Sequence, residues 1–126
     1  NGGYREIGST TELLTIAAAA TTDSSADLLP AGAVIRAVTA RVTTVIPTAA
    51  TFMIGDATTA ARFASGVSTA ANTTVTGLTH VDQTGAAGPI QSSAAKIRIT
   101  PNATPADATG RVRLTVWFER WVPPTS

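Results

Sequence analysis

The stretch RVRLTVWFERW, residues 111–121, decides the fold class, because apolar and polar side chains alternate along its whole length. One face would carry the apolar residues Val112, Leu114, Val116 and Phe118. The other face would carry Arg113, Thr115, Trp117, Glu119 and Trp121. A period of two matches a strand, whose successive side chains point to opposite faces. The sequence therefore predicts a half-buried strand over residues 111–121.

Shorter alternating segments precede this strand, and turn residues separate them. Residues 34–46 form the clearest one, with Val34, Val38, Ala40 and Val42 on one face and Ile35 and Arg41 on the other. Arg36 falls on the apolar side. Further strands are expected at 10–18, 51–54, 73–78 and 96–100. Segments rich in Pro, Gly and Asp join them, and no stretch has a convincing helical pattern. Seven or eight short strands predict an all-β fold, an antiparallel β-sandwich of the jelly-roll type.

The chain of 126 residues has the length of one domain. We assign residues 13–122 to a single β-sandwich. Residues 1–12 begin with Asn-Gly-Gly and are assigned to a linker or N-terminal arm. Residues 123–126 are assigned to a tail, because the two prolines there lack the N–H that a strand needs.

The composition favours packing and binding over catalysis. Ala and Thr supply 24 and 23 residues, and Thr, Val and Ile suit the pleated surface of a strand. A net charge of +1 gives no electrostatic reason to expect nucleic acid or a membrane surface as partner. The chain has no Cys and a single His, Tyr and Lys, which leaves little for nucleophilic or acid–base chemistry. We therefore expect a non-enzymatic protein with no metal, no cofactor and no membrane insertion.

Five segments carry a resemblance to a known family. They are LPAGAVIRAVTARVTT (29–44), FMIGD (52–56), RF (62–63), KIRITP (96–101) and GRVRLTVWFER (110–120). Together they resemble a recurring all-β domain found toward the C-terminus of tail spikes, tail fibres and related virion proteins of tailed bacteriophages. The resemblance implies a homotrimeric sandwich that caps a fibre or spike, within the virion. Some domains of this kind bind glycans of the host surface.

Trp117 and Trp121 are the first candidates for a binding site, because two rings four residues apart share one face of a strand. Three alternatives remain open for them: burial under another segment of the same chain, an interface between subunits, and a platform on which sugar rings stack. Arg113 and Glu119 on the same face favour an interface or its rim over a sealed core.

Two loops supply the remaining candidate site residues. The loop 55–66 contains Asp56 and Arg62, and the loop 79–93 contains Asp82 and Gln83. A Ca²⁺ site needs six to eight oxygen ligands, and the Asp residues of this chain are scattered along it. We therefore expect Asp56 to cap its own turn or to pair with Arg62.

Several arginines recur within the expected strands, and their role is open at this point. They are Arg36, Arg41, Arg98, Arg111 and Arg113. If several of them converge, they would bind carboxylates or ions of neighbouring subunits. The alternative is that they occupy ordinary solvent-facing positions.

The leading functional interpretation is a trimerisation and host-receptor-binding module of a tail spike or fibre. Its partners would be further copies of the chain, other virion proteins and host surface polysaccharide. A first alternative is a capsid decoration or head-fibre protein, which would bind the capsid lattice and use residues 1–12 to clamp a neighbour. A second is a carbohydrate-binding module of a secreted enzyme, a class that tends to expose more aromatic residues than this chain has in total.

Overall fold

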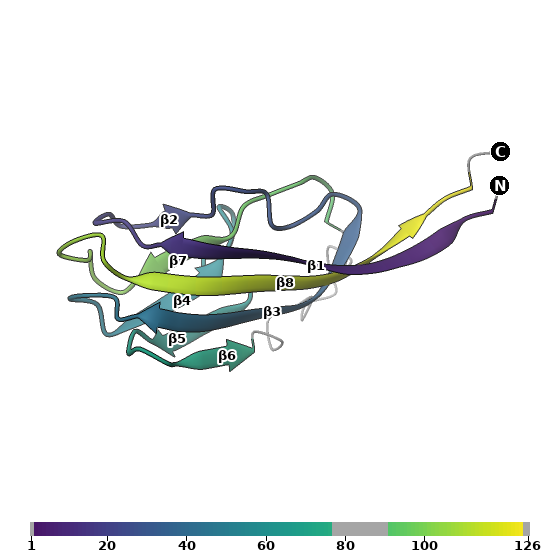
Figure 1. Ribbon diagram of the computed structural model, residues 1–126. Coiled ribbons are helices and arrows are strands. Elements are labelled where there is room, and N and C mark those ends of the chain that lie inside the picture. The colour runs from purple at the N-terminus through teal and green to yellow at the C-terminus, as the bar shows by residue number, and fades with distance from the viewer. Residues whose placement is uncertain (1, 77–90, 125–126) are drawn as a thin grey trace.

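The computed structural model describes residues 2–76 and 91–124, and the described part of the chain contains strands and no helix. The strands are β1 (Tyr4–Thr15), β2 (Thr22–Asp23), β3 (Ala33–Thr44), β4 (Thr51–Gly55), β5 (Ala64–Ser68), β6 (Thr74–Thr76), β7 (Arg98–Pro101) and β8 (Arg111–Val122). They form two four-stranded sheets (Figure 1). Within the described residues, no helix has the length and apolar character needed to cross a membrane.

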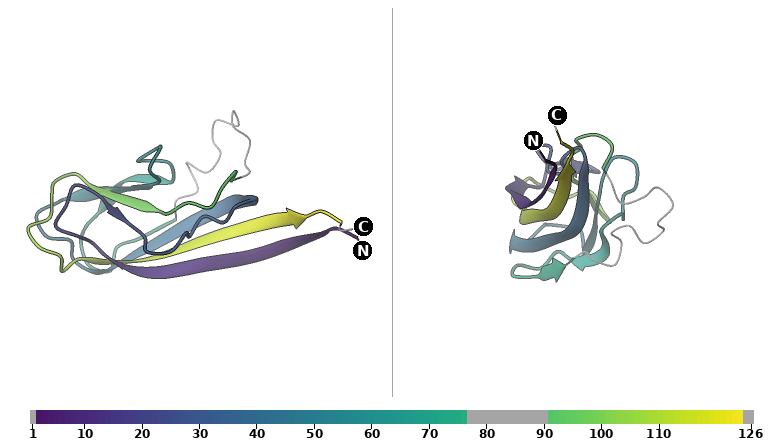
Figure 2. Two further views of the ribbon diagram at one scale, coloured as in Figure 1. Left: turned by 90° about the horizontal axis from the view of Figure 1, so that it is seen from above. Right: turned by 90° about the vertical axis from the view of Figure 1, so that its right-hand side faces the viewer.

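The two sheets pack face to face as a sandwich. The front sheet has the order β1-β8-β3-β6 and the back sheet the order β2-β7-β4-β5 (Figures 1 and 2). Every strand pair in the described chain is antiparallel. The predicted fold class, an antiparallel β-sandwich of seven to eight strands, is therefore confirmed.

The alternation along β8 places its apolar face in the core. Val112, Leu114 and Val116 have no exposed surface, and Phe118 packs against the edge of the same core. The fully buried side chains from the back sheet and its loops include Phe52, Ile54, Phe63 and Ile99. The core face predicted for residues 111–121 is confirmed.

A β-bulge corrects the faces predicted for β3. The ladder pairs Ile35 with Phe118 and Ala37 with Trp117, so Arg36 is an extra residue without an opposite partner. Ile35 is consequently buried in the core, whereas the prediction had placed it on the outer side. Arg36, which was expected on the apolar side, instead extends over the outer face. A bulge shifts the alternation by one residue, and the regular period of two could not reveal it.

The first strand begins earlier than predicted and makes the longest pairing in the molecule. It starts at Tyr4 and pairs with β8 without interruption, from Tyr4 opposite Val122 to Thr15 opposite Arg111. Both termini lie at the far end of this pair, which extends past the back sheet as a two-stranded ribbon (Figures 1 and 2). Residues 4–12, assigned from the sequence to a linker or arm, belong to β1, and the domain boundary at residue 12 stays a prediction.

Candidate functional site

Trp117 and Trp121 lie on the outer face of the front sheet. Their side chains are 47% and 53% exposed, so neither is buried under another described segment of the chain. The Trp117 indole Nε1 donates a hydrogen bond of 3.1 Å to the Thr39 hydroxyl on the neighbouring strand β3. This bond fixes the ring on the sheet while much of its surface stays in solvent. An interface and a stacking platform are the two alternatives that this exposure leaves.

A buried carboxylate separates the two tryptophans. Glu119 is 8% exposed, although it lies on the outer face of β8. Its Oε1 lies 3.2 Å from Arg36 Nε and its Oε2 lies 3.8 Å from Arg5 Nη1. The bulge in β3 is what brings Arg36 over this carboxylate. The charge at this position is therefore satisfied within the chain.

The ribbon end carries apolar side chains that the sandwich does not cover. Ile7 is 71% exposed, and its register partner is Glu119, which places it on the same face as the two tryptophans. Tyr4 is exposed on the opposite face of the ribbon, where its register partner is Val122. A shallow hollow at the tip is lined by Tyr4, Trp121 and residues beside them. We call Tyr4, Ile7 and Trp121 the ribbon cluster.

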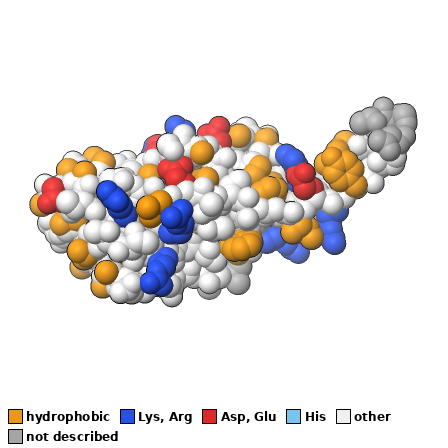
Figure 3. Space-filling model, viewed as in Figure 1, with side chains coloured by type: hydrophobic (Ala, Val, Ile, Leu, Met, Phe, Trp, Pro, Cys, Tyr) orange, Lys and Arg blue, Asp and Glu red, His pale blue; other side chains and the backbone are white. Residues whose placement is uncertain are grey.

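The opposite end of the same face is basic. Arg41 of β3 and Arg113 of β8 are direct register partners, and Arg111 lies two residues from Arg113 on the same face. Figure 3 shows basic side chains gathered on this part of the front face. We call Arg41, Arg111 and Arg113 the arginine cluster. Of the five strand arginines that the sequence singled out, the fold brings these three together.

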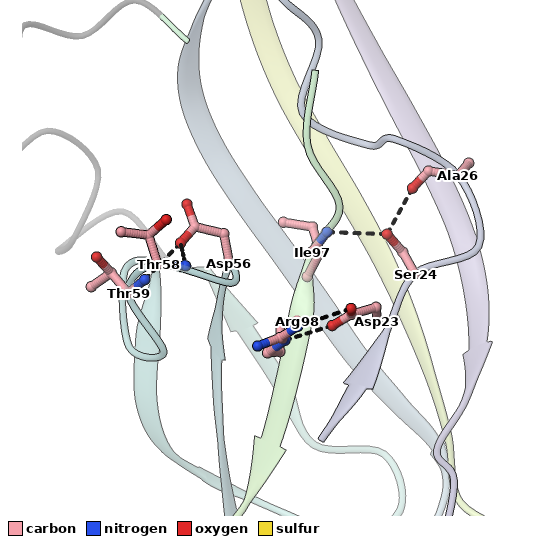
Figure 4. Close-up of polar contacts among 8 residues, drawn as sticks. All are labelled: Asp23, Ser24, Ala26, Asp56, Thr58, Thr59, Ile97 and Arg98. Carbon is pink, nitrogen blue, oxygen red and sulfur yellow. Dashed lines mark hydrogen bonds and ion pairs between the residues drawn. The ribbon is translucent and has the colours of Figure 1, made fainter. Parts of the chain in front are cut away.

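The back of the molecule holds two further predicted residues, Asp56 and Arg62. The Asp56 carboxylate accepts backbone N–H bonds from Thr58 and Thr59 at 2.9 and 2.7 Å (Figure 4). Arg62 Nη1 lies 2.9 Å from its second oxygen and also donates to the Gln91 side chain at 3.0 Å. The predicted turn cap and the predicted ion pair are thus both present. They close the loop between β4 and β5, and the two tryptophans lie on the other sheet.

A second ion pair on the back sheet was missed by the sequence reading. Arg98 donates to both Asp23 oxygens, at 2.7 and 3.1 Å (Figure 4). The hydrogen bonds from Arg98, together with its charge, hold the pKa of the Asp23 carboxyl below its usual range. Beside it, the Ser24 hydroxyl accepts the Ile97 N–H at 3.0 Å and donates to the Ala26 carbonyl. The 75 residues that separate Asp23 from Arg98 gave no local signal for this pair.

An open cavity of about 460 Å³ lies next to these ion pairs. Its charged lining residues are Asp23, Asp27, Asp56 and Lys96. Asp23 and Asp56 are already engaged by arginines, so they fix the local structure. No group of three metal-ligating side chains lies together within residues 2–76 and 91–124. The remaining predicted residues, Asp82 and Gln83, lie outside the described residues.

Comparison with known proteins adds one match. No protein-family model matches the sequence, and no curated protein matches it. Among solved structures, a chain of the "Cyanophage Pam1 capsid asymmetric unit" superposes with a TM-score of 0.52 and 24% sequence identity. The match covers 94% of this chain and 86% of that chain. The likeness is one of fold. It extends over nearly the whole sandwich and is not confined to one motif.

Proposed function

We propose that this chain is a non-enzymatic structural protein of a bacteriophage particle and that it is attached to the capsid. The observation that carries the proposal is the near end-to-end likeness to a chain of a cyanophage capsid asymmetric unit. That likeness favours a place on the head over the tail spike or fibre to which the sequence segments pointed. The charged side chains support a structural role, since Glu119, Asp23 and Asp56 are all held in ion pairs.

The location is tested on virus particles. Antibodies against the purified chain would be used for immunogold labelling of the phage whose genome encodes this sequence. We expect gold over the head, in many copies per particle. Gold confined to the tail would overturn the capsid assignment and support a spike or fibre. Absence from purified particles would overturn the virion assignment as well.

We further propose that the chain assembles as a homotrimer through the ribbon cluster. Tyr4 and Trp121 place exposed apolar surface on opposite faces of the two-stranded ribbon, which extends past the back sheet. Ile7 adds exposed apolar surface beside it, where β3 still flanks β8. A two-stranded ribbon is marginally stable by itself in water, and contacts with other copies would stabilise it. The number three comes from the family resemblance.

The oligomer is tested by sedimentation equilibrium. We expect a mass near three times the 12.8 kDa of one chain. Trp121→Ser should shift the mass toward that of one chain. Val45→Ser is the matched control, because Val45 is 51% exposed but lies outside the ribbon. A monomeric wild-type protein, or equal dissociation of both variants, would contradict the proposed contact.

A second candidate function is favoured by the exposure of Trp117 and Trp121. Two half-exposed indoles on one face of β8 are suited to stacking against sugar rings, as in a receptor-binding module. Titration of Trp fluorescence against a panel of bacterial surface polysaccharides distinguishes this role. Saturable quenching that Trp117→Ala abolishes would support it, whereas no response to any polysaccharide would count against it.

A further inference from the structure

Three of the eight arginines have no acidic partner in the described chain, and all three lie together in the arginine cluster. Arg5, Arg36, Arg62, Arg98 and Arg120 each form an ion pair. We propose that the arginine cluster is a docking surface for a carboxylate-rich segment of another protein. It is distinct from the ribbon cluster, and it holds whether or not the chain is attached to a capsid.

The placement of these arginines makes the cluster unfavourable for the isolated chain. Arg41 and Arg113 are direct register partners on adjacent strands. Like charges directly opposite each other destabilise an antiparallel pair. An acid from outside would relieve this repulsion, and the planar guanidinium groups match carboxylates with paired hydrogen bonds. The cluster therefore has the charge that an acidic partner would complement.

Asn72 holds Arg41 in place without neutralising it. The Asn72 side-chain oxygen accepts a bond of 2.9 Å from Arg41 Nη2. The Asn72 backbone N–H donates to the Val42 carbonyl at 2.7 Å, and the Asn72 φ of 69° lies in the left-handed region. Asn tolerates this conformation better than most residues. An amide at this position orients the guanidinium group and leaves its full charge for an external carboxylate.

The surroundings favour a protein partner over a phosphate backbone. Leu13, which is partly exposed, is the register partner of Arg113 on β1. Trp117 lies four residues further along the same strand face, fixed by its bond to Thr39. Arg and Trp are enriched in protein interfaces and Lys is depleted, and the single Lys of this chain, Lys96, is adjacent to the back sheet. A net charge of +1 is also too small for broad attraction to phosphates.

The probe is a synthetic hexaglutamate peptide, titrated into the ¹⁵N-labelled chain and followed by NMR. We expect saturable shifts centred on β3, β8 and the Asn72 amide. Hexaglutamine should give none. The double variant Arg41→Gln/Arg113→Gln should weaken binding by about tenfold or more, whereas Lys96→Gln should not, although it also removes a positive charge. Shifts centred elsewhere, no saturation, or equally strong binding of a thymidine oligonucleotide would overturn the proposal.

Asn72→Asp gives a second test that leaves every arginine in place. The new carboxylate has the shape of the amide and would occupy Arg41 from within the chain. We expect weaker hexaglutamate binding, by about fivefold. Asn102→Asp adds the same charge on the loop after β7, where the Asn102 side chain accepts the Ala50 and Thr51 N–H groups. If both variants bind equally well, Arg41 is not part of the docking surface and the proposal fails.

Discussion

The outer faces of the two sheets differ in how they satisfy their charges. On the back sheet, Asp23 is paired with Arg98, and the adjoining loop is closed by Asp56 and Arg62. On the front sheet, one end buries Glu119 under two arginines, while the other end leaves the arginine cluster without an acidic partner among the residues that the structure describes. Charges that hold a fold together are paired within the chain. The unpaired cluster therefore marks the front face as the side that has interactions left for a partner.

The largest loss of stability is expected from adding a methyl group at Gly55, where the loop between β4 and β5 leaves no room for it. In Gly55→Ala, the added Cβ would overlap the backbone carbonyl oxygens of Thr59 and Ala60. We expect a loss of about 3 kcal/mol in the free energy of unfolding, measured by chemical denaturation. Gly66→Ala is the control, because its Cβ meets open space but its φ of 64° is left-handed, and it should cost about 1 kcal/mol. Equal losses would mean that the loop relaxes around the clash.

A smaller loss is expected at the satisfied end of the front face. Glu119→Gln removes the charge that both Arg5 and Arg36 contact. Because these arginines are exposed and hydrated, we expect a loss of about 1–2 kcal/mol in the free energy of unfolding. Glu6→Gln, which breaks the ion pair with Arg120 near the ribbon, should cost less because the Glu6 carboxylate is more exposed than that of Glu119. If Glu119→Gln is neutral or stabilising, the free-energy cost of burying the carboxylate equals or exceeds the stabilisation from its two ion pairs.

The ion pair on the back sheet predicts a dependence on pH. The pKa of Asp23 is depressed in the folded state, so its contribution to stability is present above its unfolded pKa and is lost as pH falls through the folded one. Asp23→Asn should cost about 0.5–1 kcal/mol at pH 7, since the pair is partly exposed, and should approach the wild type as pH falls through the depressed pKa of Asp23. Thermal unfolding from pH 2 to 7 checks both expectations.

Asp27→Asn is the matched control for that pH series. Asp27 is exposed and forms no ion pair in the described part of the chain. We expect Asp27→Asn to leave the free energy of unfolding at pH 7 unchanged within about 0.5 kcal/mol. A residual loss of stability in acid should persist in Asp23→Asn, because Glu12 also has a lowered pKa. Partial burial raises that pKa, but N–H bonds from Ser25 and Ala26 and the charge of Lys96 lower it by more.

The sequence alone predicted which side chains are buried where apolar and polar residues alternate regularly. The alternation over residues 111–121 placed Leu114 in the core and Trp117 outside it, and both placements hold in the structure. Proximity along the chain was equally informative for Asp56 and Arg62, which are six residues apart and form the expected pair. Both features depend on local spacing, which a single sequence displays directly.

The other features depend on which residues lie opposite each other on paired strands, and the spacing of residues along the chain does not show this. The bulge at Arg36 is a shift in the register between β3 and β8, so only the paired strands show the extra residue. The start of β1 was missed because Tyr4, Glu6 and Gly8 are not an apolar face of their own. The Gly8 position is instead filled by the ring of Phe118 from the opposite strand. The arginine cluster likewise appears only once residues 41 and 113 are aligned across the sheet.

The smallest expected change in stability distinguishes the two sheets most sharply. Removing an arginine should stabilise the front sheet and destabilise the back sheet. Arg113→Thr removes one of two opposed charges and introduces a residue that suits a strand, so it should raise the free energy of unfolding by about 0.2–1 kcal/mol. Arg98→Thr makes the same exchange on the back sheet, where it breaks the pair with Asp23 and should lower stability. A loss in both variants would mean that Arg113 already contributes to the fold, and the front face would then no longer differ from the back.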